Sequence, residues 1–207
     1  MDEFIDNILQ AKGFMAALQV AKLNTQGELY LTGEIVVQSL ARALYDQPMS
    51  ISTRYHFITA AITEKGNLPC DWRYDNCDRS IAIHSNTRLP PDYFKDVMTS
   101  RYCVNDSSGI HVTLTELCAV HPINAGGLEP KIANYLQTAA LNIDALVLDV
   151  QNEKLWGEPG KAALLDKRVE VNNLSHLIYK AFLARIEPRK YIEAHAMILG
   201  FNHSPVI

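Results

Sequence analysis

The sequence predicts an α+β fold in which helices at both ends of the chain pack on a small central mixed sheet of about four strands. Apolar residues recur at helical spacing in residues 2–45 and again in residues 161–199. Between them, β-branched and aromatic residues alternate with polar ones, as in half-buried strands. A length of 207 residues suits one well-cored domain, so we expect residues 1–207 to form a single globular domain.

The composition is that of an ordinary soluble protein, with 48% apolar residues, 20% charged residues and a formal net charge of -4. A mildly acidic balance argues against a non-specific nucleic-acid binder, which usually has a basic surplus, so we expect no nucleic-acid partner. The acidic start of the chain is unlike a secretory signal, and no apolar stretch approaches the roughly 20 residues that span a bilayer. We therefore expect a cytoplasmic protein without membrane insertion.

Two helices are expected near the N-terminus. Residues 2–23 repeat apolar side chains at helical spacing, although Gly13 weakens the middle of this helix. Turn residues follow at 24–27, and a second amphipathic helix is expected over residues 33–45, with Thr32 as its N-cap. Because a short loop would join them, the two helices are expected to form an antiparallel hairpin.

Strands are expected in the middle of the chain. In residues 51–63 and 80–84, successive side chains alternate in character as they do on the two faces of a strand, and we expect these two strands to pair antiparallel. Helices are expected after the prolines at 90–91 and 130, and residues 145–150 read as a compact strand. Asp144, Asp149 and Glu153 surround this last strand, a position where catalytic acids often lie in α/β folds.

The segment 110–122 allows two interpretations. Residues 110–114 alternate as in a strand, whereas Thr113 and Glu116 match a capping box that would begin a helix at Leu114. We prefer a strand followed by a helical turn that ends before Pro122. A strand here, a helix and the strand at 145–150 would permit a right-handed crossover with parallel pairing.

The C-terminal part is expected to be helical. A short helix is expected over residues 161–166, and Asn172 or Asn173 is expected to cap a helix over residues 174–186. Pro188 breaks that helix, and a last helix ends at Gly200.

The helix over residues 174–186 carries an unusually wide apolar arc, formed by Leu174, Leu177, Ile178, Ala181, Phe182 and Ile186. On the opposite side of this helix, only His176, Lys180 and Ala184 form a less apolar face. Such a helix is either a central core helix or one that completes its burial in a complex. The segment 68–79 mixes aromatic and charged residues, which is typical either of a recognition surface or of a loop whose Trp72 fills the edge of the core.

These features favour a non-enzymatic adaptor or chaperone-like subunit of a larger cytosolic assembly, such as a secretion or assembly adaptor. No nucleotide-binding, dinucleotide-binding, nucleophile-elbow or zinc-helix motif is present, so we expect protein partners and no cofactor. A partner helix or peptide would dock on an apolar groove. The candidate partner-binding residues are Leu177, Phe182, Leu183, Trp72 and Tyr74.

The alternative hypothesis is a cysteine-dependent hydrolase or transferase. If the segment that contains them is a helix, Cys118 and His121 share one face of it; if it is a strand, they point to opposite faces. His111 is another candidate base. The four cysteines contain no C-x-x-C pair and are expected to be free thiols. His84, together with the other two histidines, lacks the tight spacing of a metal helix, so we expect no metal site.

Overall fold

The structure is a computed structural model that describes residues 1–46, 52–75 and 91–204. Within these ranges a mixed sheet contains β1 (Thr25–Thr32), β2 (Arg54–Ile62), β3 (Trp72–Tyr74), β4 (Arg101–Asn105), β5 (Ile110–Glu116), β6 (Val147–Asp149) and β7 (Lys154–Trp156). Their order across the sheet is β3-β4-β5-β2-β1-β6-β7. A separate two-stranded sheet pairs β8 (Arg168–Val169) with β9 (Asn202–His203).

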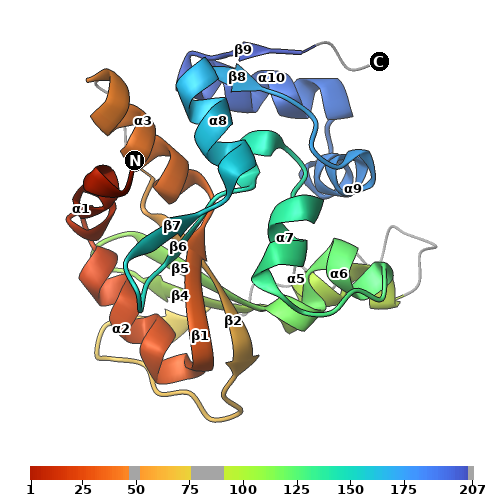
Figure 1. Ribbon diagram of the computed structural model, residues 1–207. Coiled ribbons are helices and arrows are strands. Elements are labelled where there is room, and N and C mark those ends of the chain that lie inside the picture. The colour runs from red at the N-terminus through yellow and green to blue at the C-terminus, as the bar shows by residue number, and fades with distance from the viewer. Residues whose placement is uncertain (47–51, 76–90, 205–207) are drawn as a thin grey trace.

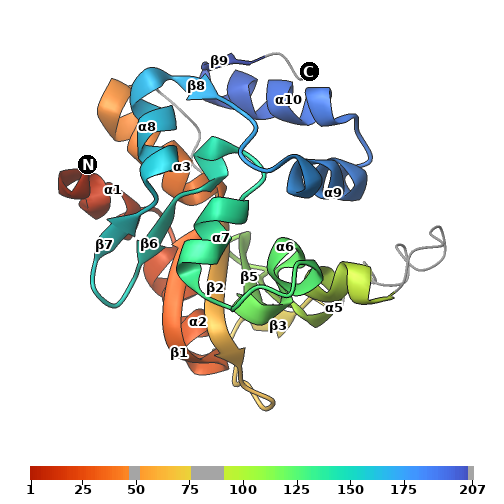
Figure 2. The same cartoon turned by 45° about the vertical axis from the view of Figure 1, so that its right-hand side comes forward.

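Helices surround the large sheet. The N-terminal helices are α1 (Ile5–Leu9), α2 (Phe14–Asn24) and α3 (Glu34–Tyr45); the middle ones are α5 (Lys95–Thr99), α6 (His121–Ala125) and α7 (Ile132–Thr138); the last are α8 (Glu158–Asp166), α9 (Leu174–Ala184) and α10 (Pro188–Leu199). Short 3-10 turns occur at Asp2–Phe4, Pro91–Phe94, Leu117–Ala119 and Asn142–Asp144. The N-terminal helices lie on one side of the sheet, α5 to α7 on the other, and α8 to α10 beyond one end of it (Figure 1, Figure 2).

The α+β class is confirmed, but the predicted small sheet of four strands is wrong, because seven strands join the large sheet within the described residues. One missed strand is β1, which begins where turn residues were expected and is buried only in its second half. Strands β3 and β7 have three residues each, too few to show an alternating pattern. That the whole chain forms one domain stays a prediction.

The centre of the sheet is β2, which pairs antiparallel with β1 and parallel with β5. Phe57 lies opposite Leu31 on one side and Leu114 on the other, and all three side chains are fully buried. This face packs against α2 and α3 in the larger apolar core. The other face carries a smaller core made by Tyr30, Ile58, Leu117, Val120, Ile123, Tyr135 and Val147.

The expected N-terminal helical hairpin is wrong. Gly13 divides the predicted helix into α1 and α2 with a φ of 85°, and a side chain there would collide with Ile110, whose Cδ1 lies 2.2 Å from the ideal Cβ position. Strand β1 then separates α2 from α3. Thr32 does not cap α3, because its hydroxyl hydrogen-bonds to the Tyr135 hydroxyl at 3.1 Å and donates to the Leu146 carbonyl at 3.2 Å.

The segment 110–122 forms β5, a 3-10 turn and α6, so the strand interpretation is confirmed and the capping box at Thr113 is not formed. Pro122 lies in the first turn of α6 rather than beyond a helix end. Parallel pairing does occur, but between β5 and β2, whereas β6 pairs antiparallel with β1. The strand expected at 80–84 lies outside the described residues.

The predicted cap at Asn173 and the predicted stop at Gly200 are confirmed, whereas α9 ends at Ala184, with Arg185 at a φ of 56°, before Pro188 is reached. The Asn173 side chain accepts a hydrogen bond from the backbone N–H of His176 at 2.9 Å and begins α9. Pro188 begins α10, and Gly200 ends it with a φ of 65°.

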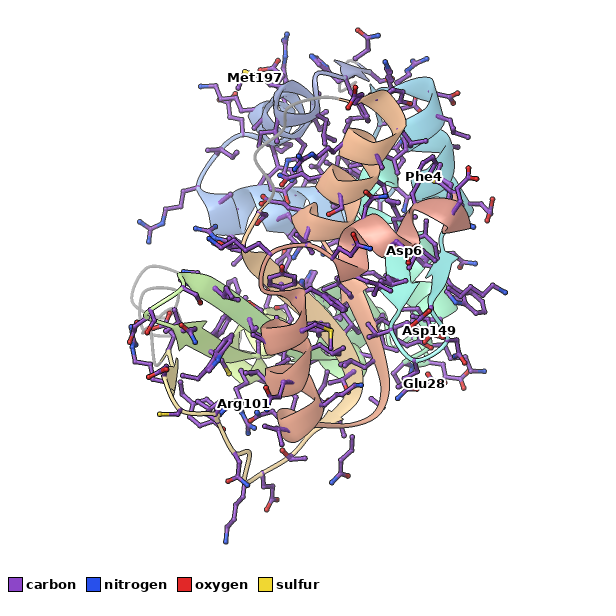
Figure 3. All side chains as sticks on the ribbon, turned by 90° about the vertical axis from the view of Figure 1, so that its left-hand side faces the viewer. Phe4, Asp6, Glu28, Arg101, Asp149 and Met197 are labelled. Atoms are coloured by element: carbon purple, nitrogen blue, oxygen red, sulfur yellow. The ribbon has the colours of Figure 1, made fainter. Side chains whose placement is uncertain are left out.

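Figure 3 shows Met197 of α10 at the end of the molecule formed by the C-terminal helices, and Arg101 of β4 near the opposite end.

Replacing Phe57 by alanine should destabilise the protein by about 3–5 kcal/mol, because it opens a cavity at the centre of the sheet. The free energy of unfolding from urea denaturation measures this loss. The matched control is Arg54→Ala at the exposed start of the same strand, which should change stability by no more than about 0.5 kcal/mol. Equal effects of the two substitutions would contradict the central role of the Phe57 side chain in the core.

Candidate functional site: a cleft between the sheet and the C-terminal helices

A cleft of about 710 Å³ lies between the sheet and the C-terminal helices. Side chains from β1, β2 and β5 line it, together with residues of α5, α7, α9 and α10. A volume of this order suits a small-molecule site, which typically occupies about 300–1,000 Å³. The lining is rich in titratable groups, and such groups gather at functional sites when their pKa values are shifted.

The sheet supplies one wall of the cleft through the alternation of its strands. His56 and Ile58 point to the cleft side of β2, and Thr115 points there from the neighbouring β5. The Nε2 atom of His56 lies 3.0 Å from the Thr115 hydroxyl. Burial, with a smaller effect of the Lys180 charge, lowers the pKa of His56 to about 3, so its ring is neutral near neutral pH.

The α9 helix supplies a second wall with the face that looked least apolar in the sequence. His176, Lys180 and Leu183 line the cleft. The predicted apolar arc largely points outward, since Leu174, Ile178, Phe182 and Ile186 are 53%, 50%, 43% and 39% exposed. Leu177 and Ala181 of this arc are buried, and polar and aromatic contacts of the inner face also hold the helix in place.

Lys180 is the electrostatic centre of the cleft. Its side chain is half-buried, and it forms no ion pair with any residue that the structure describes. Its charge acts on groups from four different elements, because it lowers the pKa of His56, His121, Asp144 and His176. Lys180 and the exposed Arg185 are the lysine and arginine residues among the described residues that line the cleft.

Acidic and phenolic groups gather on another part of the wall. Burial raises the pKa of Asp144, although the charges of His195 and Lys180 act in the opposite direction. Burial also raises the pKa of the Tyr191 phenol, and the charges of Asp144 and Glu34 add to this shift. Glu34, Asp144 and Tyr191 all line the cleft, and the two carboxyl groups can accept hydrogen bonds from a ligand.

A stack of aromatic rings supports the inner face of α9. The rings of His121 and Tyr179 are parallel, with centroids 3.7 Å apart, and Tyr179 donates a hydrogen bond to Asp96. The Nδ1 atom of His121 lies 3.0 Å from the carbonyl oxygen of Tyr93. This arrangement holds α9 against α5 and α6 and thereby fixes the position of the cleft wall.

The structure does not bring the predicted cysteine and histidines together as a catalytic pair. The Cys118 thiol lies 3.8 Å from a carboxylate oxygen of Glu116, and burial followed by the charge of Glu116 raises the pKa of this thiol. The His121 ring makes its contacts with Tyr93 and Tyr179, and His111 is exposed on β5. A raised thiol pKa disfavours the thiolate that nucleophilic catalysis requires.

The predicted partner-binding residues are dispersed over the molecule. Leu177 is fully buried, Leu183 lines the cleft, and Phe182 stacks on Phe94 with ring centroids 5.9 Å apart. Trp72 and Tyr74 are half-buried on β3, at the edge of the large sheet. A role of any of these side chains in binding stays a prediction.

The residues that define the cleft were largely missed by sequence reasoning. The sequence shows Asp144 only as one of three acids around a strand, and Lys180 only on the less apolar face of a helix. Asp149, at the end of β6, instead accepts hydrogen bonds from the backbone N–H groups of Gln151 and Asn152, at 3.1 Å each. Nothing in the sequence signals that Glu34 lines the same cleft as Tyr191 and His195, because α3 and α10 lie far apart in the chain.

Within the described ranges, no group of three or more His, Cys, Asp or Glu side chains could hold a metal ion. His84 and Cys77 lie outside those ranges. No helix of the described chain is long and apolar enough to cross a membrane. The cytoplasmic location, the absence of a cofactor and the absence of a nucleic-acid partner stay predictions.

No protein-family model matches the sequence, and no curated protein matches it. Among solved structures, the chain is similar to the complex structure of a CCA-adding enzyme with ATP, at 13% sequence identity and a TM-score of 0.49. The match covers 98% of this chain and 41% of the enzyme chain, so this chain spans less than half of the length of that enzyme.

The prediction of a non-enzymatic adaptor or chaperone-like subunit is corrected at this point. The comparisons with known proteins give this prediction no support. The feature on which the prediction depended also differs from expectation, because much of the apolar arc of α9 is exposed, whereas His176 and Lys180 line a cleft of mixed polar and apolar character.

The buried His176 should make the protein less stable in acid. Burial lowers its pKa from 6.5 to about 3, so the unfolded chain binds a proton that the folded chain does not bind between these values. Stability then falls as the pH decreases, by about 1.4 kcal/mol per pH unit for this residue. Urea denaturation from about pH 7 to about pH 5 should show a shallower loss in His176→Asn than in the wild type.

The control for this experiment is His203→Asn at an exposed position of β9, which should leave the pH dependence of stability unchanged. An equal slope in the wild type and in His176→Asn would show that His176 does not titrate differently in the folded and unfolded chains.

Proposed function

We propose that this chain binds a small molecule that carries an anionic group, such as a phosphate ester, in the cleft between the sheet and the C-terminal helices. The observation that carries this proposal is Lys180, a half-buried cation without an ion pair among the described residues. A partly desolvated charge gains most from a hydrogen-bonded partner of opposite sign.

The surroundings of Lys180 support an anionic ligand rather than an internal partner. His56 and His176 have strongly lowered pKa values and are neutral near neutral pH, so they do not compete as cations. Asp144 interacts with Lys180 through space, but burial of its carboxyl group favours the protonated form. Arg185 lies at the exposed end of α9 and adds a second positive charge to the lining.

The acids of the cleft indicate what else the ligand carries. Glu34 and Asp144 present oxygen atoms that accept hydrogen bonds, so the remainder of the ligand should offer hydroxyl or amino groups. A cleft of about 710 Å³ accommodates a molecule the size of a sugar phosphate or a nucleotide. We therefore propose a phosphorylated, polar small molecule as the ligand class.

Isothermal titration calorimetry with inorganic phosphate, ribose 5-phosphate, AMP and ATP tests this proposal. At least one phosphorylated probe should bind the wild type, and Lys180→Met should weaken its affinity by roughly 10- to 100-fold, because a charge-assisted hydrogen bond contributes about 1.5–3 kcal/mol. Lys180→Arg should retain part of the affinity, since it keeps the charge but not the geometry.

The matched control is Lys190→Met, which removes one exposed positive charge from α10 outside the cleft. This variant should bind like the wild type. Failure of every phosphorylated probe to bind, or equal losses in Lys180→Met and Lys190→Met, would refute an anion site at Lys180.

A further inference from the structure

His176 has a ring nitrogen that the fold leaves without a partner. The residue is 5% exposed and lies in the first turn of α9, where the Asn173 side chain fixes its backbone. Its Nδ1 atom lies 2.8 Å from the carbonyl oxygen of Thr138. A carbonyl oxygen can only accept a hydrogen bond, so Nδ1 carries the proton of the neutral ring. The Nε2 atom is then an acceptor.

No residue that the structure describes hydrogen-bonds to this Nε2 atom, although the atom is buried. The comparable atom of His56, on the opposite wall, is satisfied by the Thr115 hydroxyl at 3.0 Å. A buried acceptor without a donor is unfavourable, so such an atom in a cleft lining indicates that a donor is supplied from outside.

The position of His176 relative to Lys180 defines the donor further. The two residues are four apart on α9, so they are neighbours on one helix face, with Cβ atoms about 5–6 Å apart. Both line the cleft. A ligand whose anionic group contacts Lys180 therefore places groups a few bonds away beside the Nε2 atom of His176.

We propose that His176 makes the cleft selective for phosphorylated ligands that carry a free hydroxyl group a few bonds from the phosphate, as sugar phosphates and nucleotides do. The ligand hydroxyl donates its hydrogen bond to Nε2 of His176 while the phosphate contacts Lys180. This inference rests on the proposed function, and it adds a residue that selects among anionic ligands. His176 acts here through direct contact with the ligand.

Two pairs of probes that differ in hydroxyl groups test the inference. Calorimetry compares AMP with 2′,3′-dideoxy-AMP, and ribose 5-phosphate with 2-deoxyribose 5-phosphate, in the wild type and in two variants. His176→Asn keeps a donor near the position of Nδ1 for the Thr138 carbonyl but has no atom near the position of Nε2. His176→Gln can place an amide oxygen near the position of Nε2.

The wild type should bind the hydroxylated member of at least one pair roughly tenfold more tightly. His176→Asn should lose this preference without weakening the binding of the deoxygenated member, and His176→Gln should retain part of it. Circular dichroism and thermal melting show whether each variant is folded, and the conservative Gln variant keeps the comparison decisive if Asn unfolds the protein.

The outcomes separate this inference from the proposed function. Binding of phosphorylated probes without a hydroxyl preference in the wild type overturns only the role of His176. The same holds if the preference persists unchanged in both variants. Absence of binding by every phosphorylated probe overturns the anion site, and the selectivity of His176 fails with it.

Discussion

The pairing of β2 with two different neighbours is the constraint on which the remaining structure depends. This strand is antiparallel to β1 and parallel to β5, and its fully buried Phe57 joins both pairs. Because successive side chains point to opposite faces, the same register that places Phe57 in the core places His56 in the cleft. A shift by one residue would exchange these positions and remove both the core contact and one wall of the cleft.

The cleft depends on helix α9 turning its polar face inward. The stacked rings of His121 and Tyr179 and the hydrogen bond from Tyr179 to Asp96 hold the helix in this orientation. Lys180 is thereby placed where water is partly excluded, and its charge adds to the effect of burial in lowering the pKa values of His56 and His176. The proposed anion site and the contacts that anchor the helix thus lie on the same helix.

Local signals were predictable from the sequence, whereas the sheet and the cleft were not. The Asn173 cap and the Gly200 stop depend on neighbouring residues only, so both could be located. Strand β1 was missed because its first half is exposed and shows no alternation. Apolarity alone did not show which side of α9 faces the molecule, since ring stacking and buried hydrogen bonds also hold the helix. The cleft joins strands and helices far apart in the chain, and no spacing rule relates them.

The parallel pair at the centre of the sheet also determines when the chain can fold during synthesis. Residues 54–59 of β2 pair with residues 111–116, and β1 pairs with residues 147–149. Helices α2 and α3 therefore lack a complete sheet to cover until most of the chain has left the ribosome. Long-range pairing of this kind slows folding and leaves strand edges exposed meanwhile. The nascent chain is consequently most vulnerable to aggregation before β5 emerges.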